Sequence, residues 1–118
     1  MSRATLSVQN LVPGATNVTL TAPNGVGTGN GNTFTDVSGD VLLICYNTST
    51  VKTITVPDNG NLVQGIGVAD LTATITTSPA ITIVAIPPTW YSSAGTVSVD
   101  VDSTSGLTWA AVRQPTAF

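Results

Sequence analysis

The sequence contains no histidine and no glutamate, and charged residues make up 8% of its 118 positions. An average soluble domain carries about 25%. Without imidazole the chain has no Ser–His or Cys–His nucleophile pair and no histidine-ligated metal site. Its three basic residues, Arg3, Lys52 and Arg113, are scattered and form no patch for a phosphate backbone. We therefore expect no enzyme activity, no cofactor, no metal ion and no nucleic-acid partner.

Cysteine and long hydrophobic runs are also scarce. Cys45 is the one cysteine, so the chain cannot form an internal disulfide. It lies in an apolar run without a nearby cation or helix N-terminus to activate it, and we expect a small buried hydrophobe. No run approaches the roughly 18 apolar residues of a membrane-spanning helix. Residues 1–10 lack the continuous apolar stretch of a signal peptide, so we expect synthesis in the cytoplasm and no membrane partner.

Threonine and valine are abundant, and both favour strands over helices. Apolar and polar residues alternate with a period near two in five segments: 4–8, 18–21, 51–56, 71–76 and 97–102. Two further runs, 41–46 and 81–86, are apolar on both faces and predict central strands covered on both sides. A last strand is expected from Leu107 to Arg113.

Glycine, proline and asparagine turns separate these segments. About eight short strands with this punctuation predict an all-β fold, an antiparallel β-sandwich or small barrel of the jelly-roll or immunoglobulin-like kind. The first strand precedes Pro13-Gly14, so we expect an extended N-terminal arm over residues 1–12. The β-sandwich domain then covers residues 13–113, and residues 114–118 form a C-terminal tail.

Two features resemble binding sites and are interpreted as structural. Asp100 and Asp102 are two residues apart on one strand and share a face. Ca²⁺ takes six or more oxygen ligands, which nothing nearby supplies, so we expect solvated acids with Val97, Val99 and Val101 facing the core. The glycine loop over residues 25–31 precedes a strand rather than a helix, so we expect a mobile surface loop instead of a phosphate cradle.

The aromatic residues offer two interpretations. Trp90 and Tyr91 follow Pro87-Pro88 and are expected in a loop, where they either anchor a partner or fold back to plug one end of the sandwich. Phe118 at the terminus has the same two interpretations. Trp109 alternates with Thr108 on the last strand and is expected in the core.

The shortage of charge bears on assembly. Three basic and six acidic residues give little repulsion between molecules, and a single lysine gives little protection to sheet edges. We expect much of the surface, and at least one edge, to be covered by other subunits. The first strand, Ala4 to Val8, is suited to pairing with a neighbour's edge. The expected interface residues are Ala4, Leu6, Val8, Leu11, Trp90, Tyr91 and Phe118.

The order of several pieces resembles the small decoration (cement) proteins of tailed-bacteriophage capsids. The pieces are Gly31–Phe34, Val41–Asn47, Val51–Pro57, Val68–Thr72, Ile86–Pro88, Gly95–Val99 and Leu107–Arg113. The resemblance implies a structural virion protein on the outer capsid surface, assembled as a trimer or dimer. Its partners would be the major capsid protein and further copies of itself, and an N-terminal arm over residues 1–12 would do the gripping.

Two alternatives remain open. The first is a pilus or adhesin-type β-sandwich subunit that assembles by strand exchange, with residues 4–8 as the donor strand. The second is a carbohydrate-binding module in which Trp90, Tyr91 and Trp109 are the sugar platforms.

Overall fold

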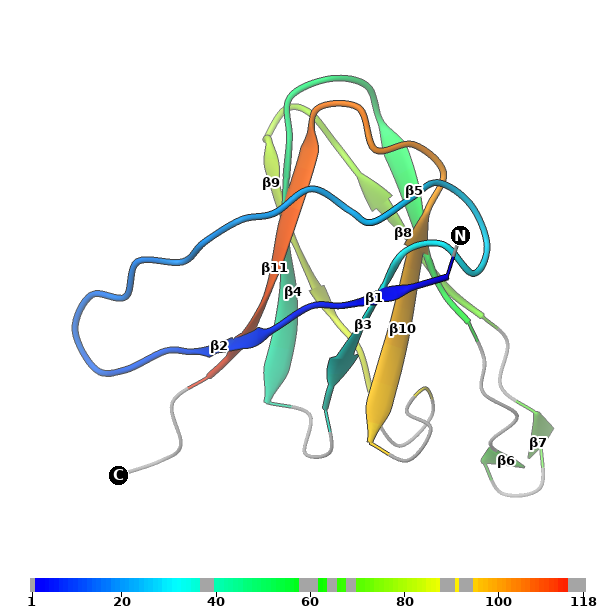
Figure 1. Ribbon diagram of the computed structural model, residues 1–118, viewed down its shortest axis with the longest axis horizontal. Coiled ribbons are helices and arrows are strands. Elements are labelled where there is room, and N and C mark those ends of the chain that lie inside the picture. The colour runs from blue at the N-terminus through cyan, green and yellow to red at the C-terminus, as the bar shows by residue number, and fades with distance from the viewer. Residues whose placement is uncertain are drawn as a thin grey trace.

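Two β-sheets with one shared hydrophobic core make up the computed structural model (Figure 1). It describes residues 2–36, 40–57, 62–63, 66–67, 70–87, 91 and 95–114. The five-stranded sheet has the order β1 (Ala4–Thr5), β3 (Asn32–Thr35), β10 (Thr96–Val101), β5 (Lys52–Val56), β8 (Leu71–Ile75). The four-stranded sheet has the order β2 (Val8–Asn10), β11 (Leu107–Arg113), β4 (Val41–Asn47), β9 (Ile81–Ala85). A separate hairpin joins β6 (Leu62–Val63) to β7 (Ile66–Gly67).

The all-β sandwich predicted from the period of two is confirmed. On β10, Val97, Val99 and Val101 face the core with at most 2% exposure, as the alternation requires. Neighbouring strands are antiparallel except at two places, where β1 runs parallel to β3 and β2 runs parallel to β11. Both exceptions involve the N-terminal segment.

That segment closes one flank of the sandwich. β1 lies against β3 at the edge of the five-stranded sheet, and β2 lies against β11 at the edge of the other sheet. Between them, Leu6 is 7% exposed and belongs to the core. In Figure 1 the segment crosses the front of both sheets. The expected extended N-terminal arm is therefore not confirmed, because the chain's own sheet edges take up the hydrogen bonds of residues 4–10.

The opposite flank is formed by β8 and β9, the far edge strands of the two sheets. The expectation that residues 81–86 form a central strand covered on both faces is wrong. β9 is an edge strand, and its outward Ile81 and Ile83 are each 57% exposed. β4 is central, between β11 and β9, yet its outward Tyr46 is 40% exposed. An apolar run such as 41–46 or 81–86 indicates that both faces of a strand are suited to burial. It does not indicate whether the same chain buries both of them.

The segment after β2 forms no strand at residues 18–21, contrary to expectation. Thr21 alone joins β11, donating from its N–H to the Trp109 carbonyl at 3.0 Å and accepting from the Trp109 N–H at 2.8 Å. Beside it, the Gln9 side-chain amide donates to the Thr19 carbonyl and accepts from the Thr19 N–H, both at 2.8 Å. A side chain thus takes the place of a neighbouring strand, and the short alternation was insufficient to identify this.

Trp109 and Cys45 lie in the core, as the sequence predicted. Trp109 is fully buried, and its Nε1 donates to Asn32 Oδ1 at 3.1 Å. Cys45 is also fully buried, and burial raises the pKa of its thiol to about 12. Cys45 therefore packs as an inert small hydrophobe, as expected.

Gly31 lies so close to β10 that a side chain would not fit. A Cβ there would be 1.9 Å from the Val99 carbonyl oxygen, whereas one on Gly14 would meet nothing within 4 Å. Gly14 instead has a φ of 100°, which disfavours alanine through backbone strain alone.

We expect Gly31→Ala to lower the free energy of unfolding by about 3 kcal/mol or more, since backbone must move to relieve the clash. Gly14→Ala, the matched control, should lower it by about 1 kcal/mol. Urea unfolding followed by tryptophan fluorescence measures both. Equal losses would show that the approach of Gly31 to Val99 is not a constraint.

Candidate functional site

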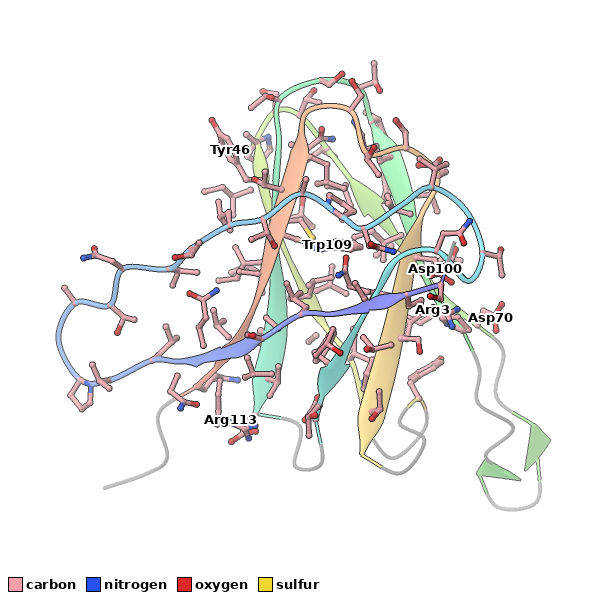
Figure 2. The ribbon with its side chains drawn as sticks, viewed as in Figure 1. Arg3, Tyr46, Asp70, Asp100, Trp109 and Arg113 are labelled. Atoms are coloured by element: carbon pink, nitrogen blue, oxygen red, sulfur yellow. The ribbon has the colours of Figure 1, made fainter. Side chains whose placement is uncertain are left out.

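A buried carboxylate connects the N-terminal segment to the body of the protein. Asp100 on β10 is 3% exposed, and Arg3 meets it with both ends of its guanidinium. Arg3 Nε donates to Asp100 Oδ1 at 2.9 Å, and Arg3 Nη2 donates to Oδ2 at 2.6 Å. Figure 2 shows the two side chains beside each other at the start of the chain. This two-point contact holds Ser2 to Thr5 against the edge of the five-stranded sheet.

The glycine loop surrounds the same carboxylate. The Gly29 N–H donates to Asp100 Oδ2 at 3.1 Å, and the Gly31 N–H donates to Oδ1 at 3.0 Å. Gly27 is also fixed, since its N–H donates to the Val101 carbonyl at 2.9 Å. The expectations of a solvated Asp100 and a loop with few contacts are both wrong. The glycine amides bind an anion after all, and that anion is a side chain of the same protein.

These contacts determine the protonation of Asp100. Burial disfavours the charged carboxylate and by itself raises the pKa. The hydrogen bond from Arg3, those from Gly29 and Gly31, and the charge of Arg3 together outweigh burial. The pKa of Asp100 therefore lies below its ordinary value of 3.8, and the carboxylate is ionised at neutral pH.

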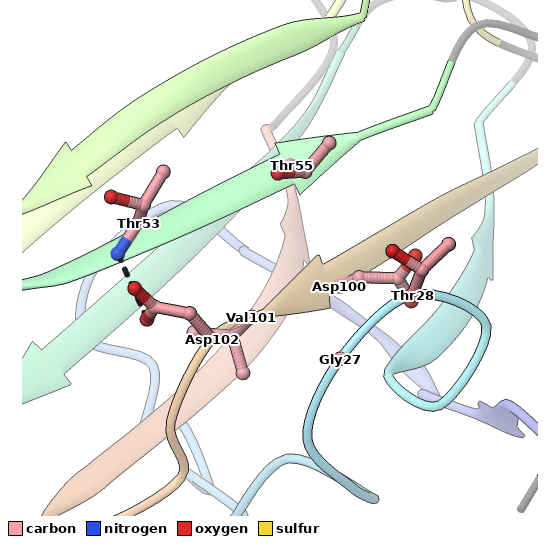
Figure 3. A pocket seen from close by; sticks show the side chains of 7 residues that line it. All are labelled: Gly27, Thr28, Thr53, Thr55, Asp100, Val101 and Asp102. Carbon is pink, nitrogen blue, oxygen red and sulfur yellow. Dashed lines mark hydrogen bonds between the residues drawn. The ribbon is translucent and has the colours of Figure 1, made fainter.

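A small pocket adjoins Asp100 on the outer face of the five-stranded sheet. It has a volume of about 140 Å³ and is lined by Gly27, Thr28, Thr53, Thr55, Asp100, Val101 and Asp102 (Figure 3). Asp102 Oδ1 accepts from the Thr53 N–H at 3.1 Å. Both oxygens of Asp100 already accept hydrogen bonds, so the two acids form no shared ligand set. Among the described residues, no group of three or more His, Cys, Asp or Glu residues is placed to hold a metal ion.

The other two basic residues also bond inside the protein. Arg113 Nη1 forms a 3.1 Å ion pair with Asp40 Oδ1. Lys52 is 1% exposed, and its Nζ donates to Asn47 Oδ1 at 3.1 Å and to the Thr50 carbonyl at 2.9 Å. Each of the three basic side chains therefore binds a partner within the protein.

An apolar surface lies on the outer faces of β4 and β9. We call it the β4–β9 strip; its residues are Leu42, Ile44, Tyr46, Ile81, Ile83 and Ala85. They pair across the two strands as Leu42 with Ala85, Ile44 with Ile83 and Tyr46 with Ile81. Figure 2 shows Tyr46 projecting outward from the sheet. The strip ends at β11, where Ala110 and Val112 are fully buried.

No ionised side chain interrupts the strip. β4 reads Val-Leu-Leu-Ile-Cys-Tyr-Asn and β9 reads Ile-Thr-Ile-Val-Ala. Within the part of the chain that the structure describes, no strand pairs with β9 on its outer edge. An apolar face next to an unpaired strand edge is the surface that natural proteins ordinarily protect with lysine, proline or a bulge. This combination makes the β4–β9 strip the candidate functional site.

The residues expected at an interface lie largely inside the fold. Leu6 is buried, Val8 packs against the core, and Ala4 and Leu11 are half-buried. Tyr91 is 6% exposed and belongs to the core cluster. Of its two interpretations, its burial fits the one in which it folds back into the sandwich. Trp90 and Phe118 lie outside the described residues. The seven-residue interface stays a prediction, and the strip is the surface that sequence analysis missed.

Comparison with protein-family models, with curated proteins and with solved structures found no match for this chain. Within the described residues, none of the secondary structure is a helix long and apolar enough to cross a membrane.

Removal of the Asp100 charge should weaken the closed flank. We expect Asp100→Asn to lower the free energy of unfolding by about 2 kcal/mol, because Arg3 and two buried amides lose a charged acceptor. Asp102→Asn on the same strand face, where the carboxylate is exposed, should cost under about 1 kcal/mol.

The Asp100 contribution should also depend on pH. A folded-state pKa below 3.8 means that the stabilisation is complete above the unfolded pKa and is lost as the pH falls through the folded one. Urea unfolding of wild type and Asp100→Asn should therefore give stabilities that converge as the pH falls from about 5 to about 2. A gap of constant size across that range would contradict the assigned protonation.

Proposed function

We propose that this chain is a structural virion protein that decorates and stabilises a tailed-bacteriophage capsid by bridging major capsid subunits. The observation that carries the proposal is the β4–β9 strip beside the unpaired edge of β9. An isolated domain gains nothing from isoleucines that are 57% exposed on an uncharged edge strand. A subunit whose strip is buried in an assembly gains binding free energy from these isoleucines.

The internal use of the cations supports the same proposal. Arg3, Lys52 and Arg113 all bond within the fold, and among the described acids only Asp70 and Asp102 are exposed. A surface of threonine, serine and apolar side chains can be covered without desolvating ions, which is costly. The resemblance to capsid decoration proteins gives this assembly its proposed setting on the outer surface of a virion.

The proposed mechanism is passive. A protein that binds the mature shell and not its dissociated subunits stabilises the shell by mass action. Many copies around one shell make modest individual affinities large in sum. No bond is made or broken, in keeping with a chain for which we expect no catalytic group.

Neither alternative gains support from the described residues. Strand exchange needs a free donor, and residues 4–10 pair with β3 and β11 of their own chain. A sugar platform needs an exposed ring, and Tyr91 and Trp109 are buried.

The test is binding to capsids. A gene for a major capsid protein beside the gene for this chain would identify the shell to use. We expect purified protein to bind expanded capsids saturably in co-sedimentation and to be oligomeric in light scattering. A clean monomer without affinity for these capsids would contradict the proposal.

A matched pair of variants connects binding to the strip. Tyr46→Lys places a charge within the strip, where the native side chain is 40% exposed. Val26→Lys places the same charge at a site in the glycine loop that is 51% exposed and outside the strip. We expect Tyr46→Lys to weaken capsid binding at least about tenfold, because covering the strip then buries an ammonium. Val26→Lys should leave it within about twofold. Equal effects would remove the strip from the interface.

A further inference from the structure

The free edge of β9 presents an orderly row of backbone groups. The Asn47 N–H donates to the Ala80 carbonyl at 2.9 Å, which sets the phase of the ladder between β4 and β9. Alternate residues point their N–H and C=O groups to opposite sides of a strand. Ala80, Thr82 and Val84 therefore turn these groups toward β4, and Ile81, Ile83 and Ala85 turn theirs toward the open flank.

The same three residues also carry the exposed side chains. Ile81 and Ile83 are each 57% exposed on the outer face, and Ala85 is exposed beside them. Thr82 and Val84 face the other way, and Val84 is 6% exposed. The edge of β9 thus offers backbone groups that no described strand pairs with, and apolar side chains, at the same positions.

We propose that β9 pairs antiparallel with β9 of a second copy of this chain, about a two-fold axis at Ile83. This inference rests on the proposed assembly role and specifies one of its contacts. The pairing sets Ile83 opposite Ile83 and Ile81 opposite Ala85, and each such pair exchanges both of its N–H···O bonds. The two four-stranded sheets then form one continuous sheet with a continuous apolar outer face.

The register argues for a second copy rather than a foreign strand. On the outer face, apolar residues meet apolar residues in the self-pairing, because Ile83 lies opposite Ile83 and Ile81 opposite Ala85, as a two-fold interface requires of a single surface patch. The net charge of −3 would oppose the approach of identical molecules, but β9 and β4 contain none of the charged residues. A partner selected by charge would need a complementary charge pattern, which this edge does not contain.

The size of the contact fits the same partner. Five residues at about 3.4 Å each give a strand of about 17 Å, so the pairing lies below the standard interface of about 800 Å² per partner. A pair of this size forms weakly between free molecules. It becomes strong when a surface holds many copies next to one another, because neighbours then meet at a high effective concentration.

Cysteine crosslinking in the full-length chain tests the register. Across the two-fold axis the two Ile83 Cα atoms would lie about 5.5 Å apart, within the range of about 4.4–6.8 Å that a disulfide spans. Ile83→Cys should therefore form a covalent dimer under mild oxidation. Ile81→Cys is the matched control, equally exposed at 57% on the same strand face. Its two copies would lie about 14 Å apart. Native Cys45 is fully buried and does not compete.

We expect the Ile83→Cys dimer to form at least about ten times faster than the Ile81→Cys dimer, because only the former places its thiols within bonding distance. Equal rates, or no crosslink at millimolar protein, would overturn the pairing. Circular dichroism and tryptophan fluorescence confirm that both variants are folded.

A lysine substitution gives a second measurement. Ile83→Lys sets like charges directly opposite each other across the axis, so sedimentation equilibrium should show self-association at least about tenfold weaker than in wild type. Val26→Lys, at 51% exposure, should associate as wild type does. If both variants associate as wild type does, the pairing is wrong.

Capsid binding separates this inference from the proposed function. Capsid binding without preferential crosslinking at Ile83 overturns the β9 pairing and leaves the decoration role standing. Preferential crosslinking without capsid binding supports the pairing and removes that role. A monomeric wild type whose capsid binding is lost in Ile83→Lys overturns the pairing and assigns the edge of β9 to a strand of the capsid protein.

Discussion

The architecture depends on one buried carboxylate. Asp100 is 3% exposed in the middle of the five-stranded sheet, and it has Arg3 on one side and the amides of Gly29 and Gly31 on the other. A carboxylate can be kept charged at such a site only if charged and polar donors replace the lost water. Those donors come from Arg3, which directly precedes β1, and from the glycine loop. The Asp100 side chain therefore holds the N-terminal segment and the glycine loop against β10.

The two flanks of the sandwich are closed to different degrees. On the N-terminal side a single segment crosses both sheets and provides β1 and β2 as their last strands. On the other side β8 and β9 are edges without such a cover among the described residues. The sequence predicted that residues 4–8 pair with the sheet edge of a neighbouring subunit, but in the structure they close a flank of their own chain. The flank that the sequence marked as core has β9 as an open edge among the described residues, and this is the edge that we propose a second copy covers.

The sequence was sufficient for the fold class and for most of the core, because a period of two assigns buried and exposed faces locally. Val97, Val99, Trp109 and Cys45 are buried as that pattern requires. It was insufficient for the pairing of Arg3 with Asp100, which are 97 residues apart and have no local signal. It also misplaced β9, because an apolar face looks the same whether its own chain or a second molecule covers it. The burial of Lys52 was also missed, although its partners Asn47 and Thr50 are close along the chain, because a lysine in an alternating strand is ordinarily expected to face solvent.

The parallel pairing of β2 with β11 also constrains the order of events during synthesis. Val8 lies opposite Ala111, and Arg3 binds Asp100, so this flank cannot close until β10 and β11 have been synthesised. Contacts of such long range slow folding, because loop closure must precede any gain in stability. Until β2 pairs with it, the edge of β11 lacks the strand that covers it in the folded protein, as the edge of β9 does among the described residues. Arg3 and β2 therefore reach their final contacts only after strands that lie far later in the chain have formed.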